Sequence, residues 1–188
     1  MSPKVVFAFA FASIAAAALP AGPASAAAFV IGGGMADACS QAAVQGRDDR
    51  ASLDTCTVAL ESQPLVGRDR AGTLVNRGVI HLRRKAFIDA RRDFDAALRL
   101  EPQLGEAFVN RGAAYIAERR YSEGVAEIDR GLALGADEPE KAYFNRALAW
   151  EGLDDMKAAW LDYQKALELR PDWEAPRREL ARFSISRQ

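Results

Sequence analysis

The sequence predicts an all-α fold, an α-solenoid of antiparallel helical hairpins closed by a C-terminal capping helix. The main observation is an internal repeat, because the triplet Asn-Arg-small starts at Asn76, Asn110 and Asn145, at intervals of 34 and 35 residues. A second observation is that small and bulky residues follow each triplet at matching distances with helical spacing. Such a period indicates stacked helical units that together bury one continuous core.

Residues 1–26 have the pattern of a secretory signal peptide. Lys4 precedes an uncharged apolar run of about 15 residues, and small residues follow Pro20. The motif Ala24-Ser25-Ala26 fits the cleavage rule best. A membrane anchor is the alternative, but a spanning helix needs about 20 apolar residues. We therefore expect an exported protein, periplasmic or secreted, without a membrane span after signal cleavage.

Residues 27–35 are predicted to be a flexible leader. Gly32, Gly33 and Gly34 lie in this segment, and glycine is unfavourable in a helix because it loses the most backbone entropy.

The repeat divides the chain into three clear units of two helices each. Their bounds are 71–104, 105–139 and 140–173. In the first unit, Pro102 ends the second helix because its ring and missing N–H cannot continue the hydrogen-bond ladder. The second unit has Gly124 and Gly131 where the others have alanine. We expect its second helix to be the least stable of the three, at about 1 kcal/mol per interior glycine.

These units resemble the tetratricopeptide repeat (TPR), whose pattern is W-x2-L-G-x2-Y, then A-x3-F, then a closing proline. The resemblance covers residues 71–173. The A-x3-F element is present as Ala90 with Phe94, and as Ala159 with Tyr163. The tyrosine position of the first unit holds His81, so we expect the sole histidine to have a packing role and not a catalytic one.

Two further segments complete the predicted solenoid. Residues 36–70 resemble a degenerate hairpin, because Ala59-Leu60-Glu61 and Pro64 match the end of the third unit. Residues 174–188 are predicted to form a capping helix and tail, since Pro176 suits the first turn of a helix and a terminal repeat needs an apolar cover.

The alignment of the degenerate hairpin places Cys39 and Cys56 on facing helices. Because export means an oxidising compartment, we expect a Cys39–Cys56 disulfide. A redox-active pair is the alternative, although these two cysteines lie much further apart in the sequence than the C-x-x-C spacing of catalytic thiols.

In TPR proteins the first helix of each unit lines the concave side, where partners dock, and the resemblance implies such a groove here. An asparagine amide can donate to a backbone carbonyl and accept from an N–H, so a row of three could hold an extended peptide. Alternatively, the asparagines bond the backbone of the neighbouring hairpin. The predicted peptide-binding groove consists of Asn76, Asn110, Asn145, Val75, Val79, Arg83, Val109, Ala113, Ile116, Phe144 and Leu148.

The family's clamp for acidic C-termini is not reproduced, because Val75 and Val79 occupy two of its positions. We therefore expect apolar or backbone recognition of a protein or peptide partner.

An acid follows each triplet arginine at the same distance along the chain. Three identical offsets predict one structural ion pair per hairpin, which would hold the register of its two helices. The pairs are Arg77 with Asp93, Arg111 with Glu127, and Arg146 with Asp162.

Composition argues against several other functions. The chain has 25 Lys plus Arg, 26 Asp plus Glu and a net charge of −1, which does not favour a nucleic-acid partner. Two cysteines and one histidine exclude the common zinc sites, and no phosphate-binding or catalytic motif occurs. We expect no cofactor and no enzyme activity.

The sequence predicts an adaptor or scaffold of the cell envelope that binds a partner. The alternative is a periplasmic thiol-disulfide protein using Cys39 and Cys56.

Overall fold

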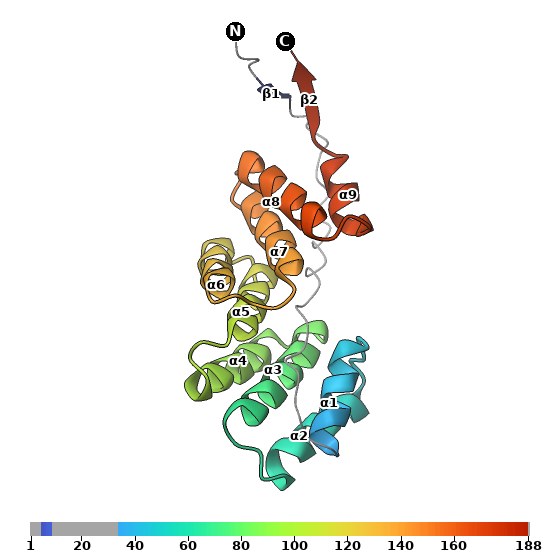
Figure 1. The fold of residues 1–188 in the computed structure, drawn as a ribbon, viewed down its shortest axis with the longest axis vertical. Coiled ribbons are helices and arrows are strands. Elements are labelled where there is room, and N and C mark those ends of the chain that lie inside the picture. Colours follow the sequence, from blue (N-terminus) through green and yellow to red (C-terminus); the bar gives the residue numbers. More distant parts are fainter. Residues whose placement is uncertain (1–4, 9–33, 188) are drawn as a thin grey trace.

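The computed structural model describes residues 5–8 and 34–187, and this part of the chain forms an α-solenoid (Figure 1). The predicted all-α solenoid is therefore confirmed. The described helices are α1 (Met35–Val44), α2 (Arg50–Ser62), α3 (Gly67–Arg83), α4 (Phe87–Leu100), α5 (Gly105–Ala117), α6 (Tyr121–Ala133), α7 (Pro139–Gly152), α8 (Met156–Leu169) and α9 (Glu174–Leu180).

Consecutive described helices pair as hairpins, α1/α2, α3/α4, α5/α6 and α7/α8, and α9 packs on α8. The first helices also contact one another in turn, α1 with α3, α3 with α5, and α5 with α7. These first helices form the inner row of the solenoid. The second helices α2, α4, α6 and α8 form the outer row, and each of the first three also contacts the first helix of the next hairpin.

A short antiparallel pair of strands lies apart from the helical stack (Figure 1). Strand β1 (Val5–Ala8) pairs with β2 (Ser184–Arg187), with Val5 opposite Arg187. The rest of the predicted signal peptide, and all of the predicted leader before Gly34, lie outside the described residues. None of the described helices is long and apolar enough to cross a membrane.

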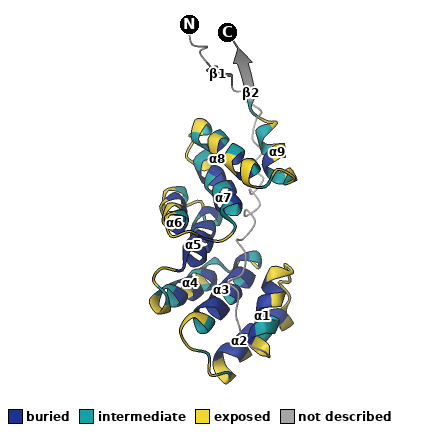
Figure 2. Cartoon of the chain, in the orientation of Figure 1, coloured by how far each residue is buried: buried dark blue, intermediate teal, exposed yellow. Residues whose placement is uncertain are grey.

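The core runs between the two rows of helices (Figure 2). Phe94, Ile128 and Tyr163 are 0% exposed and occupy the same position in the three repeats. At the C-terminal end, Tyr163 Oη donates to Glu151 Oε1 at 2.5 Å, and Arg182 Nη2 donates to Glu151 Oε2 at 3.0 Å. These contacts tie the segment after α9 to the last hairpin.

Glycines bring α5 and α6 unusually close. A Cβ atom on Gly112 would lie 2.9 Å from the carbonyl oxygen of Gly124, and one on Gly131 would lie 2.8 Å from that of Gly105. Backbone atoms at that distance cannot give way. Gly131 weakens α6 as an isolated helix but is required by its packing against α5, and alanine could not replace it without moving the two helices apart.

A candidate peptide-binding face on the inner helices

The asparagines of the repeat lie at equivalent positions on α3, α5 and α7. Asn76 and Asn110 are 0% exposed and Asn145 is 1% exposed within the full chain. Asn110 Nδ2 donates to the carbonyl oxygen of Glu106 at 2.9 Å, one turn earlier in α5. The donor thus bonds its own helix and not the neighbouring hairpin. Asn110 Oδ1 is buried and accepts no hydrogen bond from the described residues.

The remaining predicted groove residues also lie on the inner helices, and the structure buries nearly all of them. Arg83 is the partly exposed member. Its Nη1 donates to the carbonyl oxygen of Ala43 at 2.6 Å, which ties α3 to the end of α1. Burial lowers the pKa of Arg83. The fully or almost fully buried members are Val75, Val79, Val109, Ala113, Ile116, Phe144 and Leu148.

Each repeat arginine forms the ion pair that the constant offset predicts. Arg77 donates through Nε and Nη2 to both oxygens of Asp93, at 2.8 and 2.7 Å. Arg146 also donates through Nε and Nη2 to both oxygens of Asp162, each at 2.7 Å. In the α5/α6 hairpin, Arg111 Nε donates to Glu127 Oε2 at 2.7 Å.

These pairs hold the arginines in their charged form. The hydrogen bond to Asp93 raises the pKa of Arg77, and the hydrogen bond to Asp162 raises the pKa of Arg146. Because the guanidinium groups are bound between helices of the scaffold, they are not free to bind a partner.

The same arginines also reach back to the preceding hairpin, which sequence reasoning missed. Arg111 Nη1 donates to Asp95 of α4 at 2.6 Å, and Arg146 pairs with Asp129 of α6. The signal was present in the sequence, because Asp95 and Asp129 each come two residues after the acid that pairs within the hairpin. Each of these arginines therefore joins three helices from two neighbouring repeats.

The first inter-hairpin contact is weaker. Arg77 Nη1 donates to Thr57 Oγ1 of α2 at 3.4 Å. Thr57 occupies the position of Asp95 in the degenerate hairpin, so an uncharged acceptor replaces the carboxylate there. The link between the first two hairpins consequently relies less on charge.

Cys39 and Cys56 form a disulfide between α1 and α2, with Sγ atoms 2.05 Å apart. The predicted bond is therefore present in the structure. Both cysteines are 0% exposed. Thiol exchange requires a thiolate to reach a disulfide sulfur, so this burial favours a structural bond over a redox-active pair.

His81 lies at an edge of the first repeat, as its packing position predicts. Its side chain is 17% exposed, and Nε2 lies 3.9 Å from Asp93 Oδ2. Burial lowers the pKa of His81, although the nearby Asp93 charge opposes that effect. Among the described residues, no group of three or more His, Cys, Asp or Glu side chains could hold a metal ion.

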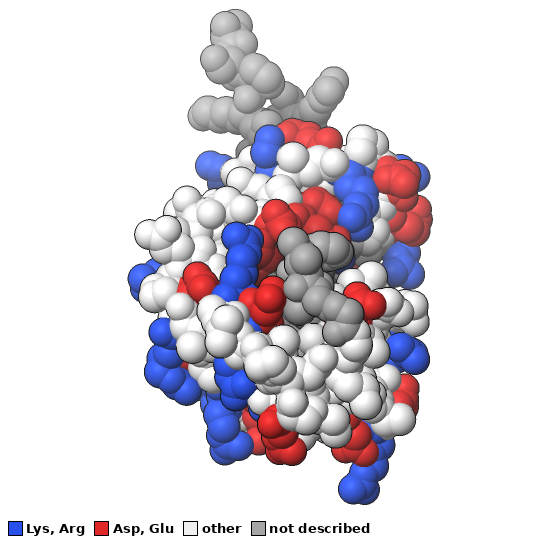
Figure 3. Space-filling view, turned by 60° about the horizontal axis from the view of Figure 1, so that its bottom comes forward, with Lys and Arg blue, Asp and Glu red and all other residues white. Residues whose placement is uncertain are grey.

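The face shown in Figure 3 carries acidic and basic side chains side by side. Many charged side chains of the described chain are paired, as in Arg146 with Asp129 and Arg170 with Glu140. This face offers no broad basic area of the kind that binds a nucleic-acid backbone.

Comparison with solved structures shows many TPR domains. The Arabidopsis OM64 TPR domain has a TM-score of 0.56 at 21% identity, covering 60% of this chain and 92% of that chain. MamA has a TM-score of 0.59 at 17% identity, covering 76% and 80%. The first TPR of Spaghetti (RPAP3), solved with the HSP90 peptide SRMEEVD, has a TM-score of 0.57 at 23% identity, covering 62% and 91%.

Two curated proteins match about two thirds of the chain. The DnaJ homolog subfamily C member 7 homolog of Dictyostelium discoideum is 24% identical over 125 residues, which are 65% of this chain and 22% of that protein. The E3 ubiquitin-protein ligase CHIP of Arabidopsis thaliana is 27% identical over 124 residues, 66% of this chain and 42% of that protein. The chain thus spans less than half the length of either relative. No family model matches the chain.

The structural neighbours show that this chain has the fold of TPR domains, a class of helical-repeat protein. The curated relatives add a weaker likeness in sequence.

Proposed function

We propose that the chain is a non-enzymatic adaptor that binds an extended peptide or protein segment along the inner row of helices. The observation that supports this most is the equivalent placement of Asn76, Asn110 and Asn145 among apolar residues, with an acceptor on Asn110 that receives no hydrogen bond from the described residues. A peptide backbone supplies N–H donors at regular spacing, which such a row of amides can accept.

The proposed signal cleavage would remove residues 1–26 from the chain. Binding experiments therefore belong on the secreted form that starts near Ala27.

The structural neighbour solved with SRMEEVD supports peptide binding as the use of this fold, but its acidic ligand does not carry over. Val75 and Val79 stand where a family clamp for carboxylates would place polar side chains. Apolar side chains beside backbone-binding amides suit an extended segment that is held by apolar and backbone contacts and not by a terminal carboxylate.

Peptide display tests the adaptor function directly. Random peptides would be selected on the mature chain, and the affinity of a selected peptide would be measured by calorimetry. The triple variant Asn76→Ala, Asn110→Ala and Asn145→Ala should bind at least about tenfold more weakly, since each lost hydrogen bond contributes about 0.5–1.5 kcal/mol.

A matched control keeps this experiment specific. Ile88 on α4 and Leu161 on α8 are 65% and 50% exposed on the outer row, so the double variant Ile88→Ala and Leu161→Ala should bind like the parent. Undiminished binding by the triple variant, with its helical circular dichroism intact, would refute the asparagine row as the binding site.

Export is the second part of the proposal, supported by the signal-like N-terminus and by the disulfide. N-terminal sequencing of the protein recovered outside the cytoplasm should give a start at or near Ala27. Recovery of the chain from the cytoplasm with Met1 intact would contradict it.

A further inference from the structure

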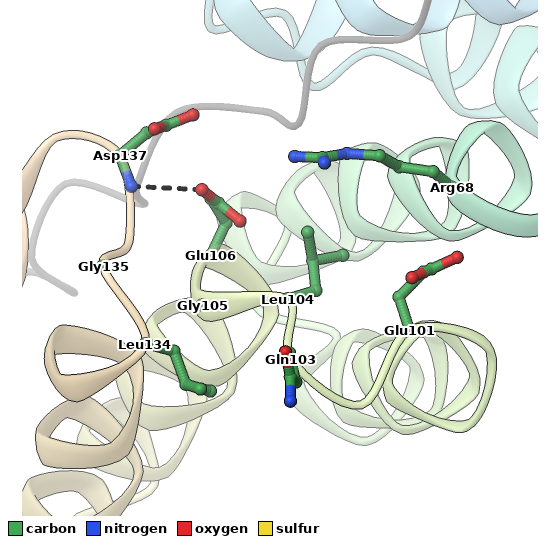
Figure 4. Close-up of a pocket in the computed structure, with 9 residues that line it drawn as sticks. All are labelled: Arg68, Glu101, Gln103, Leu104, Gly105, Glu106, Leu134, Gly135 and Asp137. Carbon is green, nitrogen blue, oxygen red and sulfur yellow. Dashed lines mark hydrogen bonds between the residues drawn. The ribbon is translucent and has the colours of Figure 1, made fainter.

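A polar pocket of about 350 Å³ opens beside the start of α5, between the loop before that helix and the loop before α7 (Figure 4). Its lining holds three carboxylates, Glu101, Glu106 and Asp137, against the guanidinium of Arg68. None of these four groups forms an ion pair with a described residue. The pocket therefore has an excess of negative charge that the described residues do not neutralise.

Glu106 is the informative member of this set. It is 7% exposed, and its Oε1 accepts a hydrogen bond from the Asp137 backbone N–H at 3.1 Å. Its carboxylate points into the space between Arg68 and Asp137 (Figure 4), and Oε2 accepts no hydrogen bond from the described residues. A carboxylate so nearly buried is costly unless a donor or a cation completes its partners.

Acceptors outnumber donors among the charged groups of the pocket. Glu101, Glu106 and Asp137 are carboxylates, and Arg68 is the single charged donor in the lining. Glu106 Oε2, Glu101 and Asp137 can therefore accept hydrogen bonds from a ligand that carries positive charge.

We propose that the pocket receives a lysine or arginine side chain of a peptide bound along the inner helices. An ammonium or guanidinium group has donors and no acceptor, and its apolar stem could lie on Leu104 and Leu134, which also line the pocket. This inference rests on the proposed function and adds to it a preference for a basic residue. Glu106 stands where the other repeats have Gly72 and Lys141, so the preference belongs to the second repeat.

The test is to titrate small-molecule probes into the isotope-labelled mature chain and to monitor the NMR chemical shifts of its backbone amides. The probes are Nα-acetyl-arginine amide, its neutral analogue Nα-acetyl-citrulline amide, and Nα-acetyl-glutamate amide. The arginine probe should shift the amides of Gly105, Gly135 and Asp137 in a saturable way, while the other two should not. Equal shifts by the citrulline probe, binding of the glutamate probe at Arg68, or no shift by the arginine probe would each overturn the proposal.

Two variants should change the affinity in opposite directions. Glu106→Gln keeps an oxygen for the Asp137 N–H but loses the charge, and it should weaken the arginine probe about three- to fivefold, the size of one partly exposed ion pair. Arg68→Gln removes a repelling cation and should strengthen the probe. Glu61→Gln, at an exposed site on α2, should have no effect. An unchanged affinity in both pocket variants would refute the assignment.

This outcome is distinguishable from failure of the adaptor function. If displayed peptides bind the asparagine row but carry no basic residue, and the arginine probe leaves the pocket unshifted, the basic preference is wrong while the adaptor function stands. If displayed peptides show no dependence on the asparagines, the proposed function itself is refuted.

Discussion

Arg146 donates two hydrogen bonds of 2.7 Å to Asp162 and at the same time forms an ion pair with Asp129 of the preceding hairpin. One guanidinium thus fixes both the register inside a repeat and the contact between repeats. The same arrangement occurs at Arg111 with Glu127 and Asp95. The solenoid is therefore joined by charged contacts as well as by its apolar core.

Arg146→Lys should lower the free energy of unfolding by about 1–2 kcal/mol. Lysine keeps the charge but cannot form the bidentate pair with Asp162 or span to Asp129 with the same geometry. The measurement is denaturant unfolding of both proteins. Arg99→Lys, at an exposed site on α4, should leave the midpoint unchanged, and an equal loss in the two variants would contradict the role assigned to Arg146.

Asp95→Asn should loosen the contact between the second and third hairpins more than it destabilises either one. Repeat proteins are stabilised by each unit and by its interface with the next, and Asp95 acts at that interface through Arg111. Amide hydrogen exchange should show faster exchange in α3 and α4 relative to α7 and α8.

A double-mutant cycle that combines Asp95→Asn with Arg111→Lys measures the coupling energy between the two side chains. The coupling should be favourable but below about 1 kcal/mol, because Asp95 is half exposed. Zero coupling would show that the contact is incidental.

Reduction of the disulfide should lower the free energy of unfolding by about 3 kcal/mol. The closed loop restricts the unfolded chain, and breaking the bond restores that conformational entropy. Because the loop lies within α1 and α2, the loss should be localised. Hydrogen exchange of the Cys39→Ser and Cys56→Ser double variant should accelerate first in these two helices. Uniform acceleration through α8 would instead mean that the whole solenoid depends on this hairpin.

His81 should make the fold weaker on mild acidification. Burial lowers the pKa of His81 in the folded chain, while in the unfolded chain it titrates near pH 6.5. As the pH falls through that value the unfolded state takes up a proton before the folded state does, so the free energy of unfolding decreases. His81→Phe, which places an aromatic ring there as in the other repeats, should flatten stability between about pH 7 and pH 5. An identical slope in the variant would assign the effect to other groups.

The repeat made most of the helical architecture predictable, because small residues such as Gly78 and bulky ones such as Phe94 recur at matching positions. A Cβ atom on Gly78 would lie 2.5 Å from Phe94 Cε1, which is the close contact that their spacing implies. The partner acids of the arginines inside each hairpin were predictable for the same reason, since each acid follows its arginine at a constant offset.

Contacts that depend on how repeats stack were harder to foresee. Arg111 with Asp95 and Arg146 with Asp129 have different offsets, 16 and 17 residues, because the second unit is one residue longer. The turns within the three repeat hairpins place Lys85, Arg119 and Asp154 at positive φ values of 61°, 62° and 65°. Lys85 and Arg119 give little signal for that conformation, because glycine, asparagine and aspartate are its usual occupants.

The candidate face was predictable in its position and not in its burial. The sequence pattern indicates which residues of α3, α5 and α7 face inward, but the extent of their contact with other segments depends on tertiary packing. The pocket around Glu106 was not foreseen, because Glu101 and Asp137 come from loops that approach only when two hairpins stack.

The most direct test of the adaptor function is an NMR map of the chain from Ala27 onward with a peptide selected by display. Binding along the inner row predicts the largest amide shifts in α3, α5 and α7, around Val79, Asn110 and Leu148. Shifts concentrated in the outer helices α4, α6 and α8, with the inner row unchanged, would contradict the account.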